Sequence, residues 1–229
     1  MLPTEVIAAA KRRQLSLLGL TDHNSAENVG AFVAASAGSG VRVLPGMEVT
    51  TREEVHVVTL FEDVEQALAW QEMVYRHLPP LANDERAFGT QLVVDAADRI
   101  VRVNERLLMT ATDLTLGQVI EEVDRAGGLA IPAHVDRAAF GLLSQLGFVP
   151  DDLDIPAVEV SKHADPVDAV RLHQSLLGRA IIQSSDAHYV DDIGVGRTVF
   201  WLAEPTLAEL KLACRGREGR RVAMRRPRG

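Results

Sequence analysis

Apolar and polar positions along the chain change repeatedly between two patterns, which predicts strands and helices in succession. Short apolar runs at 15–20, 41–46, 129–132, 157–160 and 180–183 are typical of buried strands, and the second of these ends in a turn signal. The stretches between them repeat apolar positions every three to four residues, as amphipathic helices do. This alternation indicates an α/β fold with a largely parallel sheet or barrel.

Helix boundaries are marked by residues that satisfy the first backbone N–H groups. Pro3 suits the first turn of a helix over 3–13, and Asn24 with Glu27 resembles a capping box that opens a helix through about Ala37. Further helices are expected at about 63–77, from 115, at about 137–146, from 165 and at about 205–214.

A hairpin is predicted where two extended segments, 47–51 and 55–60, flank three charged residues. If the turn is centred on Arg52, Glu48 and His56 are directly opposite, with Cβ atoms roughly 4.5–5.5 Å apart. A carboxylate and an imidazole at that separation can share a metal ion.

The alternation is interrupted at 79–111, which contains a loop and a small hairpin with its turn near 96–98. We interpret this region as an insertion in a single domain over 1–214. Residues 215–229 form a basic tail, for which a frayed, solvated terminus is the alternative to an anion contact.

Composition limits the classes of protein. The chain has 229 residues, 47% hydrophobic and 24% charged, enough for one α/β domain with a real core. No apolar run approaches the roughly 18 residues that a membrane helix needs. A single cysteine, Cys214, suits a reducing cytoplasm. The net charge of −8 argues against tight binding of long nucleic acid.

Histidines and acids recur where predicted strands end. Asp186 and His188 follow the strand at 180–183, and residues i and i+2 of an extended chain point to the same side. His23 and His134 follow two other strands. In α/β barrels this end carries the active site. Together with Glu48 and His56 of the hairpin, these residues provide four imidazoles and two carboxylates. Such a set of ligands suits zinc, manganese or iron better than magnesium or calcium.

The motifs TDHNS, PGMEV followed by VHVV, IPAHVDR and SSDAH stand in this order, and together they resemble the PHP (polymerase and histidinol phosphatase) family. The resemblance extends over about 3–201. It implies a distorted seven-stranded (β/α) barrel in which up to three metal ions hydrolyse phosphate esters. The matching ligands are His23, Glu48, His56, His134, Asp186 and His188.

The N-terminus departs from the family pattern. The family opens with a strand bearing His-x-His and a further ligand, whereas this chain starts with Met1 at the first helix. A late start codon, a truncated chain and a naturally degenerate copy all explain the difference. We expect an incomplete barrel with unpaired edges, fewer bound metals, and lower stability or closure by a partner, including a second copy of the chain.

Three further residues are candidates for function. Asp22 faces away from its neighbour His23, so it is a partner for an imidazole or a proton carrier, with a helix N-terminal polar residue as the alternative. Arg137 and Lys162 could neutralise a substrate phosphate, or they are ordinary surface charges.

The sequence therefore predicts a cytoplasmic, metal-dependent phosphoesterase that attacks small phosphate esters or nucleotides through metal-activated hydroxide. Glu48 would bridge metals, and Asp22 would help to move protons. The alternatives are a catalytically impaired binding or regulatory domain, and a metal-dependent hydrolase of carbon–nitrogen bonds. No membrane contact is expected.

Overall fold

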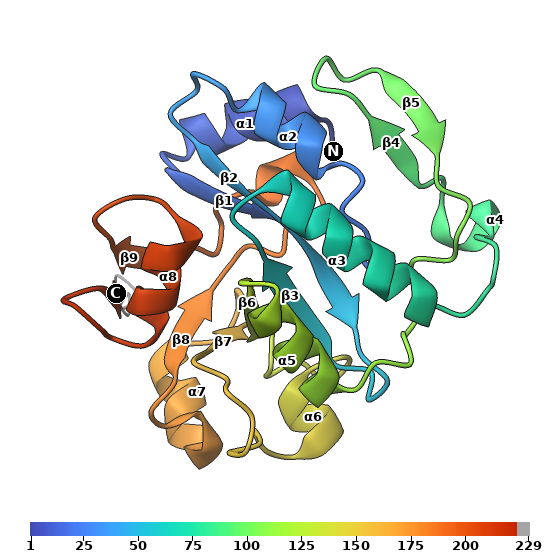
Figure 1. The fold of residues 1–229 in the computed structure, drawn as a ribbon. Helices are drawn as coiled ribbons and strands as arrows, with labels where there is room; N and C mark the ends of the chain where they lie inside the picture. Colours follow the sequence, from blue (N-terminus) through green and yellow to red (C-terminus); the bar gives the residue numbers. More distant parts are fainter. Residues whose placement is uncertain (224–229) are drawn as a thin grey trace.

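A computed structural model describes residues 1–223 as a mixed α/β fold, with a four-stranded sheet in the order β1-β2-β3-β6 (Figure 1). The strands are β1 (Leu17–Leu20), β2 (Arg42–Thr50), β3 (His56–Leu60), β4 (Leu92–Val94), β5 (Ile100–Val103), β6 (Leu129–Pro132), β7 (Ala157–Val160), β8 (Ala180–Gln183), β9 (Val199–Trp201) and β10 (Arg221–Ala223). The helices are α1 (Pro3–Arg12), α2 (Val29–Ala35), α3 (Val64–His77), α4 (Glu85–Phe88), α5 (Leu116–Arg125), α6 (Leu142–Leu146), α7 (Pro166–Leu172) and α8 (Leu207–Cys214), with 3₁₀ turns at Gln174–Leu176 and Val190–Asp192.

The sheet is less parallel than the sequence pattern predicts. β1 and β2 are parallel, and so are β7 and β8, but β3 runs antiparallel to both of its neighbours. The reason is the short hairpin between β2 and β3, since a connection of this length joins only antiparallel strands. β7 lies next to β6, and just beyond the end of β6 the N–H of Val135 donates to the carbonyl oxygen of Glu159 in β7 at 2.8 Å.

The turn expected at the end of 41–46 is wrong, because β2 continues through Pro45 and Gly46 to Thr50. A Cβ atom on Gly46 would lie 2.2 Å from the carbonyl oxygen of Thr59. Glycine therefore marks a close approach of β3 here rather than a turn.

The starts of α5 and α2 show where a capping box forms and where it does not. The helix expected from 115 is α5, and a capping box of Thr115 and Gln118 opens it. The box expected at Asn24 is wrong, because α2 starts only at Val29 and the buried side chain of Asn24 has other partners. Its amide donates to the carbonyl oxygens of Leu108 and Thr110, each at 2.8 Å.

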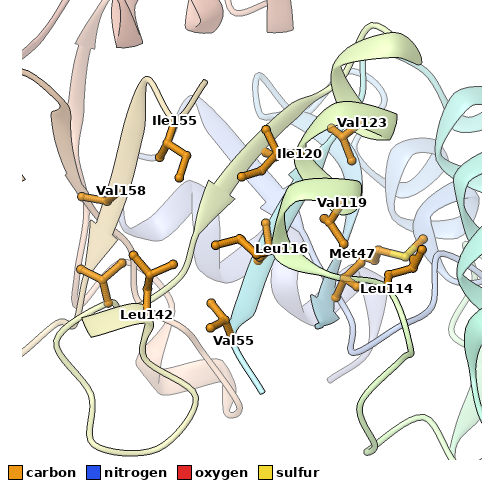
Figure 2. Close-up of a cluster of buried hydrophobic side chains, with 14 of the residues drawn as sticks. Met47, Val55, Leu114, Leu116, Val119, Ile120, Val123, Leu142, Ile155 and Val158 are labelled. Carbon is orange, nitrogen blue, oxygen red and sulfur yellow. The ribbon is translucent and has the colours of Figure 1, made fainter. Parts of the chain in front are cut away.

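Helices α3 and α5 cover one face of the sheet (Figure 1). Figure 2 shows the core there, where apolar residues of α5 meet residues of β2, β7 and the loops around them. The labelled side chains are Met47, Val55, Leu114, Leu116, Val119, Ile120, Val123, Leu142, Ile155 and Val158. A second apolar cluster joins the sheet, β8 and α8, and includes Leu44, Ile182 and Leu210.

The hairpin predicted within 79–111 is confirmed: β4 pairs with β5, and the N–H of Asp95 donates to the carbonyl oxygen of Arg99 across the turn. At the other end of the chain, β10 pairs with β9 inside the segment predicted as a basic tail. The remaining tail positions, 224–229, lie outside the described residues. No helix within 1–223 combines the length and apolar character needed to cross a bilayer.

The barrel expected from the sequence is not closed by hydrogen bonds in residues 1–223. There β1 pairs only with β2, and β8 pairs only with β7. A cavity of about 1210 Å³ lies between them, lined by residues of both strands and by apolar side chains such as Leu60 and Ile131. β1 is accordingly half-exposed, whereas β2 is buried along almost its whole length.

Candidate metal centre

The β2–β3 hairpin positions the first two candidate ligands, but not in the register that the sequence suggests. His56 is opposite Thr50, and Glu48 is opposite Val58, so the turn is centred one residue later than Arg52. Glu48 and His56 are diagonal neighbours on one face instead of a direct pair. Long side chains still meet across a diagonal, and His56 Nδ1 lies 3.3 Å from Glu48 Oε2.

Glu48 is the centre of the arrangement, because its carboxylate contacts three imidazoles. His23 Nδ1 is 3.2 Å from Oε2, and His134 Nε2 is 3.4 Å from Oε1. The rings of His23 and His56 lie 5.3 Å apart, as do those of His56 and His134. We call these four residues the histidine cluster.

Backbone pairing continues beyond β1 and brings His23 to Glu48. These two residues form a parallel bridge, in which the N–H of Glu48 donates to the carbonyl oxygen of Asp22 and the N–H of Asn24 donates to that of Glu48. Asn24 Oδ1 also accepts from the N–H of Thr50. Asn24, which the sequence predicts as a helix cap, therefore forms hydrogen bonds to β2 beside the cluster.

Electrostatics in the histidine cluster favour an ionised carboxylate. Burial opposes ionisation of Glu48, but hydrogen bonds from His134 and His56 outweigh it and hold its pKa well below the usual range. Burial lowers the pKa of His23 despite the attraction of Glu48. Burial also opposes protonation of His134, yet the hydrogen bond to Glu48 and the charge of that carboxylate together outweigh burial and raise the pKa of His134.

The donor set fits a divalent transition metal. One donor atom each from His23, Glu48 and His56 lies within 4.8 Å of the others, and nitrogen with carboxylate oxygen is the donor chemistry that zinc, manganese and iron accept. His134 Nδ1 is buried and has no hydrogen-bond partner in residues 1–223. An unpartnered buried ring nitrogen is unusual and suits a site that binds an ion.

The other predicted ligands lie beside this cluster rather than in it. Asp186 Oδ2 is 2.6 Å from the guanidinium of Arg137, and His188 is 62% exposed with its ring 6.3 Å from that of His23. Lys162 Nζ lies 3.6 Å from Asp192. Arg137 and Lys162, the two side chains predicted to bind phosphate, thus each have a carboxylate partner.

Two candidate residues have a strained backbone just after the strands that carry them. His134 has a φ of 31° and Asp186 a φ of 45°, both in the left-handed region that side chains with a Cβ rarely adopt. Such strain is commonly found at functional sites.

Asp22 is exposed, lines the large cavity, and accepts a hydrogen bond from the Asn28 amide at 3.0 Å.

The sequence analysis missed Glu159, the buried acid of β7. Ser184 Oγ donates to it at 2.5 Å, and burial raises its pKa to about 7. It also missed Phe140, which stacks on His56 at 4.4 Å. A glutamate inside the apolar run AVEV was the available signal for Glu159.

The fold of this chain is shared with solved structures. No family model matches the chain. The lesion-specific endonuclease PfuEndoQ of Pyrococcus furiosus superposes with a TM-score of 0.70 at 20% identity, over 96% of this chain and 52% of the endonuclease. An amidohydrolase from Chromobacterium violaceum superposes with a TM-score of 0.56 at 20% identity, covering 85% of each chain.

One curated relative matches in sequence. A 3′,5′-nucleoside bisphosphate phosphatase from Chromobacterium violaceum is 42% identical over an alignment of 71 residues that covers 29% of this chain and 25% of that protein. The chain thus spans about half the length of the endonuclease, and its match covers a quarter of the phosphatase. The structural likeness establishes the fold, and the activity is a separate inference.

Proposed function

We propose that the chain is a metal-dependent phosphoesterase of the PHP family. The observation that carries this proposal is the histidine cluster, in which three imidazoles from separate strand ends surround the buried Glu48 carboxylate. Support comes from two proteins similar to this chain, one named as a phosphatase and one as an endonuclease, both hydrolysing phosphoesters. The four-stranded sheet and the β7–β8 pair would form parts of the distorted barrel typical of that family.

Two groups of residues would hold the ions. The histidine cluster forms the first group, with Glu48 as a bridging ligand, and Asp186 and His188 beside it form the second. A divalent ion bound there would lower the pKa of water for attack on phosphorus and offset charge on the phosphoryl oxygens. Asp22 lines the same cavity and would carry protons away from the site.

A small phosphorylated molecule is the proposed substrate. Arg137 is 37% exposed, so its guanidinium can turn from Asp186 toward a phosphate. Lys162 would add a second positive charge. The acidic chain, with a net charge of −8, makes a small ester or nucleotide a better substrate than long nucleic acid.

A catalytically impaired binding domain is a second candidate, favoured by the open edge of β1 beside His23. Substrate phosphate and metal would then bind without turnover. The two candidates make different predictions for the same assay.

The test is hydrolysis of bis-p-nitrophenyl phosphate and p-nitrophenyl phosphate by metal-stripped protein to which manganese or zinc is returned. We expect turnover that needs the metal and is lost in His134→Ala, while His77→Ala, at a partly exposed histidine paired with Asp113, retains it. Metal binding without turnover of either ester would favour the impaired domain. Equal turnover by both variants would rule out the cluster as the active site.

A further inference from the structure

A second cleft, of about 580 Å³, lies at the opposite end of β8 from the histidine cluster. It is lined by Ala180 and Ile181 at the start of β8, by the end of α8 and by β10, whereas Asp186 lies beyond the end of the strand. From Ala180 to Gln183 the three steps of β8 cover about 10 Å at roughly 3.3 Å per residue, and Asp186 lies three residues further along the chain. The cleft is therefore distinct from the candidate metal centre.

Four arginines line this cleft, one just before β8 and three from the segment 215–221, and we call it the arginine cleft. They are Arg179, Arg215, Arg217 and Arg221. Asp154 is the one acid in the lining. A local excess of positive charge on a chain with a net charge of −8 runs against the overall composition. Arg215, Arg217 and Arg221 also lie in the segment 215–229, which the sequence predicts as a basic tail.

The carboxylates nearby do not neutralise this excess. Arg215 bonds to Asp154 through both of its terminal nitrogens, and Arg179 bonds to Asp151 at 2.9 Å. Arg217 and Arg221 pair with no carboxylate within residues 1–223. Two of the four guanidinium charges are thus matched and two are not.

The single acid of the lining is itself surrounded by cations. The hydrogen bond from Arg215 lowers the pKa of Asp154, and the charges of Arg217 and Lys211 lower it further. Asp154 therefore stays ionised and holds Arg215 in place at the edge of the cleft. The unpaired guanidinium groups remain available to a ligand.

Arg221 is oriented by an aromatic ring instead of an acid. Its guanidinium carbon lies 4.7 Å from the ring centroid of Trp201, which is 56% exposed. Stacking restricts the guanidinium while leaving its N–H donors unused. Trp201 also provides a spectroscopic probe, because the other tryptophan, Trp70, is buried.

We propose that the arginine cleft binds a phosphate-bearing anion at a site separate from the metal centre. Planar guanidinium groups match phosphate oxygens with paired N–H donors, and the cleft has the volume of a small-molecule site. A ligand with two phosphate groups would have one phosphate for each of the two unpaired arginines. This inference does not depend on the proposed phosphoesterase activity.

The probe is pyrophosphate, titrated into metal-stripped protein by calorimetry, with Trp201 fluorescence as a second readout. We expect Arg217→Gln/Arg221→Gln to weaken binding at least about tenfold, since it removes two charged donors. The matched double variant is Arg76→Gln/Arg171→Gln, which changes the net charge equally at exposed positions on α3 and α7 and should bind like the parent.

A third variant, His134→Ala, separates the cleft from the metal centre and should leave pyrophosphate binding within about twofold of the parent. A single-stranded oligonucleotide serves as a second ligand, and loss of its binding in the same cleft variant would identify nucleic-acid phosphates as the source. The proposal is overturned if the parent binds no pyrophosphate, if both double variants weaken equally, or if His134→Ala alone removes binding.

Discussion

The two halves of the candidate site are built differently. The half on the main sheet consists of His23, Glu48, His56 and His134, which contact one another and are mostly buried. The half that follows β8 consists of Asp186 and the exposed His188, and its carboxylate lies 2.6 Å from the Arg137 guanidinium and 3.8 Å from the His188 ring.

The difference follows from backbone pairing. Strands β1, β2, β3 and β6 share one hydrogen-bonded sheet, so the side chains at their ends have fixed relative positions. β8 belongs to a separate two-stranded ladder, across the large cavity from β1. The sheet half is therefore preorganised for a metal, whereas the β8 half is held by an ion pair that a ligand can replace.

The strongest test of this contrast replaces one ligand from each half. His134→Ala should lower metal affinity at least about 100-fold, because it removes a buried donor from the preorganised half, whereas His188→Ala should lower it about tenfold or less. Metal content by mass spectrometry and affinity by competition with a chelating dye measure both effects. His77→Ala is the control, and an equal loss in the two ligand variants would contradict the contrast.

Glu48→Gln should remove the charge around which the sheet half is organised. In metal-free protein above pH 5 we expect the free energy of unfolding to fall by about 3 kcal/mol or more, which is typical when a buried charged group loses its partners. The folded pKa of Glu48 lies below its unfolded value of 4.5, so its stabilisation is present above pH 4.5 and is lost as the pH falls through the folded pKa.

Urea unfolding between pH 3 and 7 measures this dependence. The parent should lose stability toward acid more steeply than Glu48→Gln, so the two curves converge at low pH. Parallel curves would show that the carboxylate is not ionised inside the cluster.

Glu159→Gln tests the boundary between the halves, where Ser184 beside β8 donates to this buried acid of β7. Its folded pKa of about 7 exceeds the unfolded 4.5, so the parent loses stability as the pH rises from 4.5 through 7. The variant lacks this loss and should be more stable than the parent above pH 7 by up to about 3 kcal/mol. Unfolding at pH 5 and pH 8 provides the comparison, and Ser184→Ala controls for the hydrogen bond alone.

Sequence patterns predict the sheet half better than the β8 half, and the reason is physical. His23 and His134 follow apolar strands, and the hairpin brings Glu48 near His56 even though its predicted register was wrong by one residue at the turn. A diagonal neighbour on the same face is as useful to a metal as a direct one. Local periodicity is therefore sufficient for this half of the site.

Other features depend on contacts between distant segments, which periodicity does not encode. Arg137 and Asp186 are 49 positions apart, and nothing local in either motif indicates their ion pair. The role of Asn24 depends on backbone carbonyls of Leu108 and Thr110 in the inserted region. The same limit explains why the turn signal at Gly46 was misread: the glycine serves the neighbouring strand β3.

The smallest expected effect concerns the ion pair that holds the β8 half. Arg137→Met should change the free energy of unfolding by less than about 1 kcal/mol, because a partly exposed pair contributes little. Its effect should be on substrate: the KM for a phosphomonoester should rise about tenfold while kcat changes little, since a guanidinium that binds phosphate equally in the ground and transition states acts on KM.

Arg137→Lys keeps the charge but loses the paired donors, so it should restore only part of the affinity. Steady-state kinetics with manganese-loaded protein distinguishes two roles for this residue. An unchanged KM together with higher metal affinity would mean that Arg137 only occupies Asp186, and that its removal frees the carboxylate as a ligand. A raised KM with unchanged metal affinity would mean that the pair opens to receive the substrate phosphate.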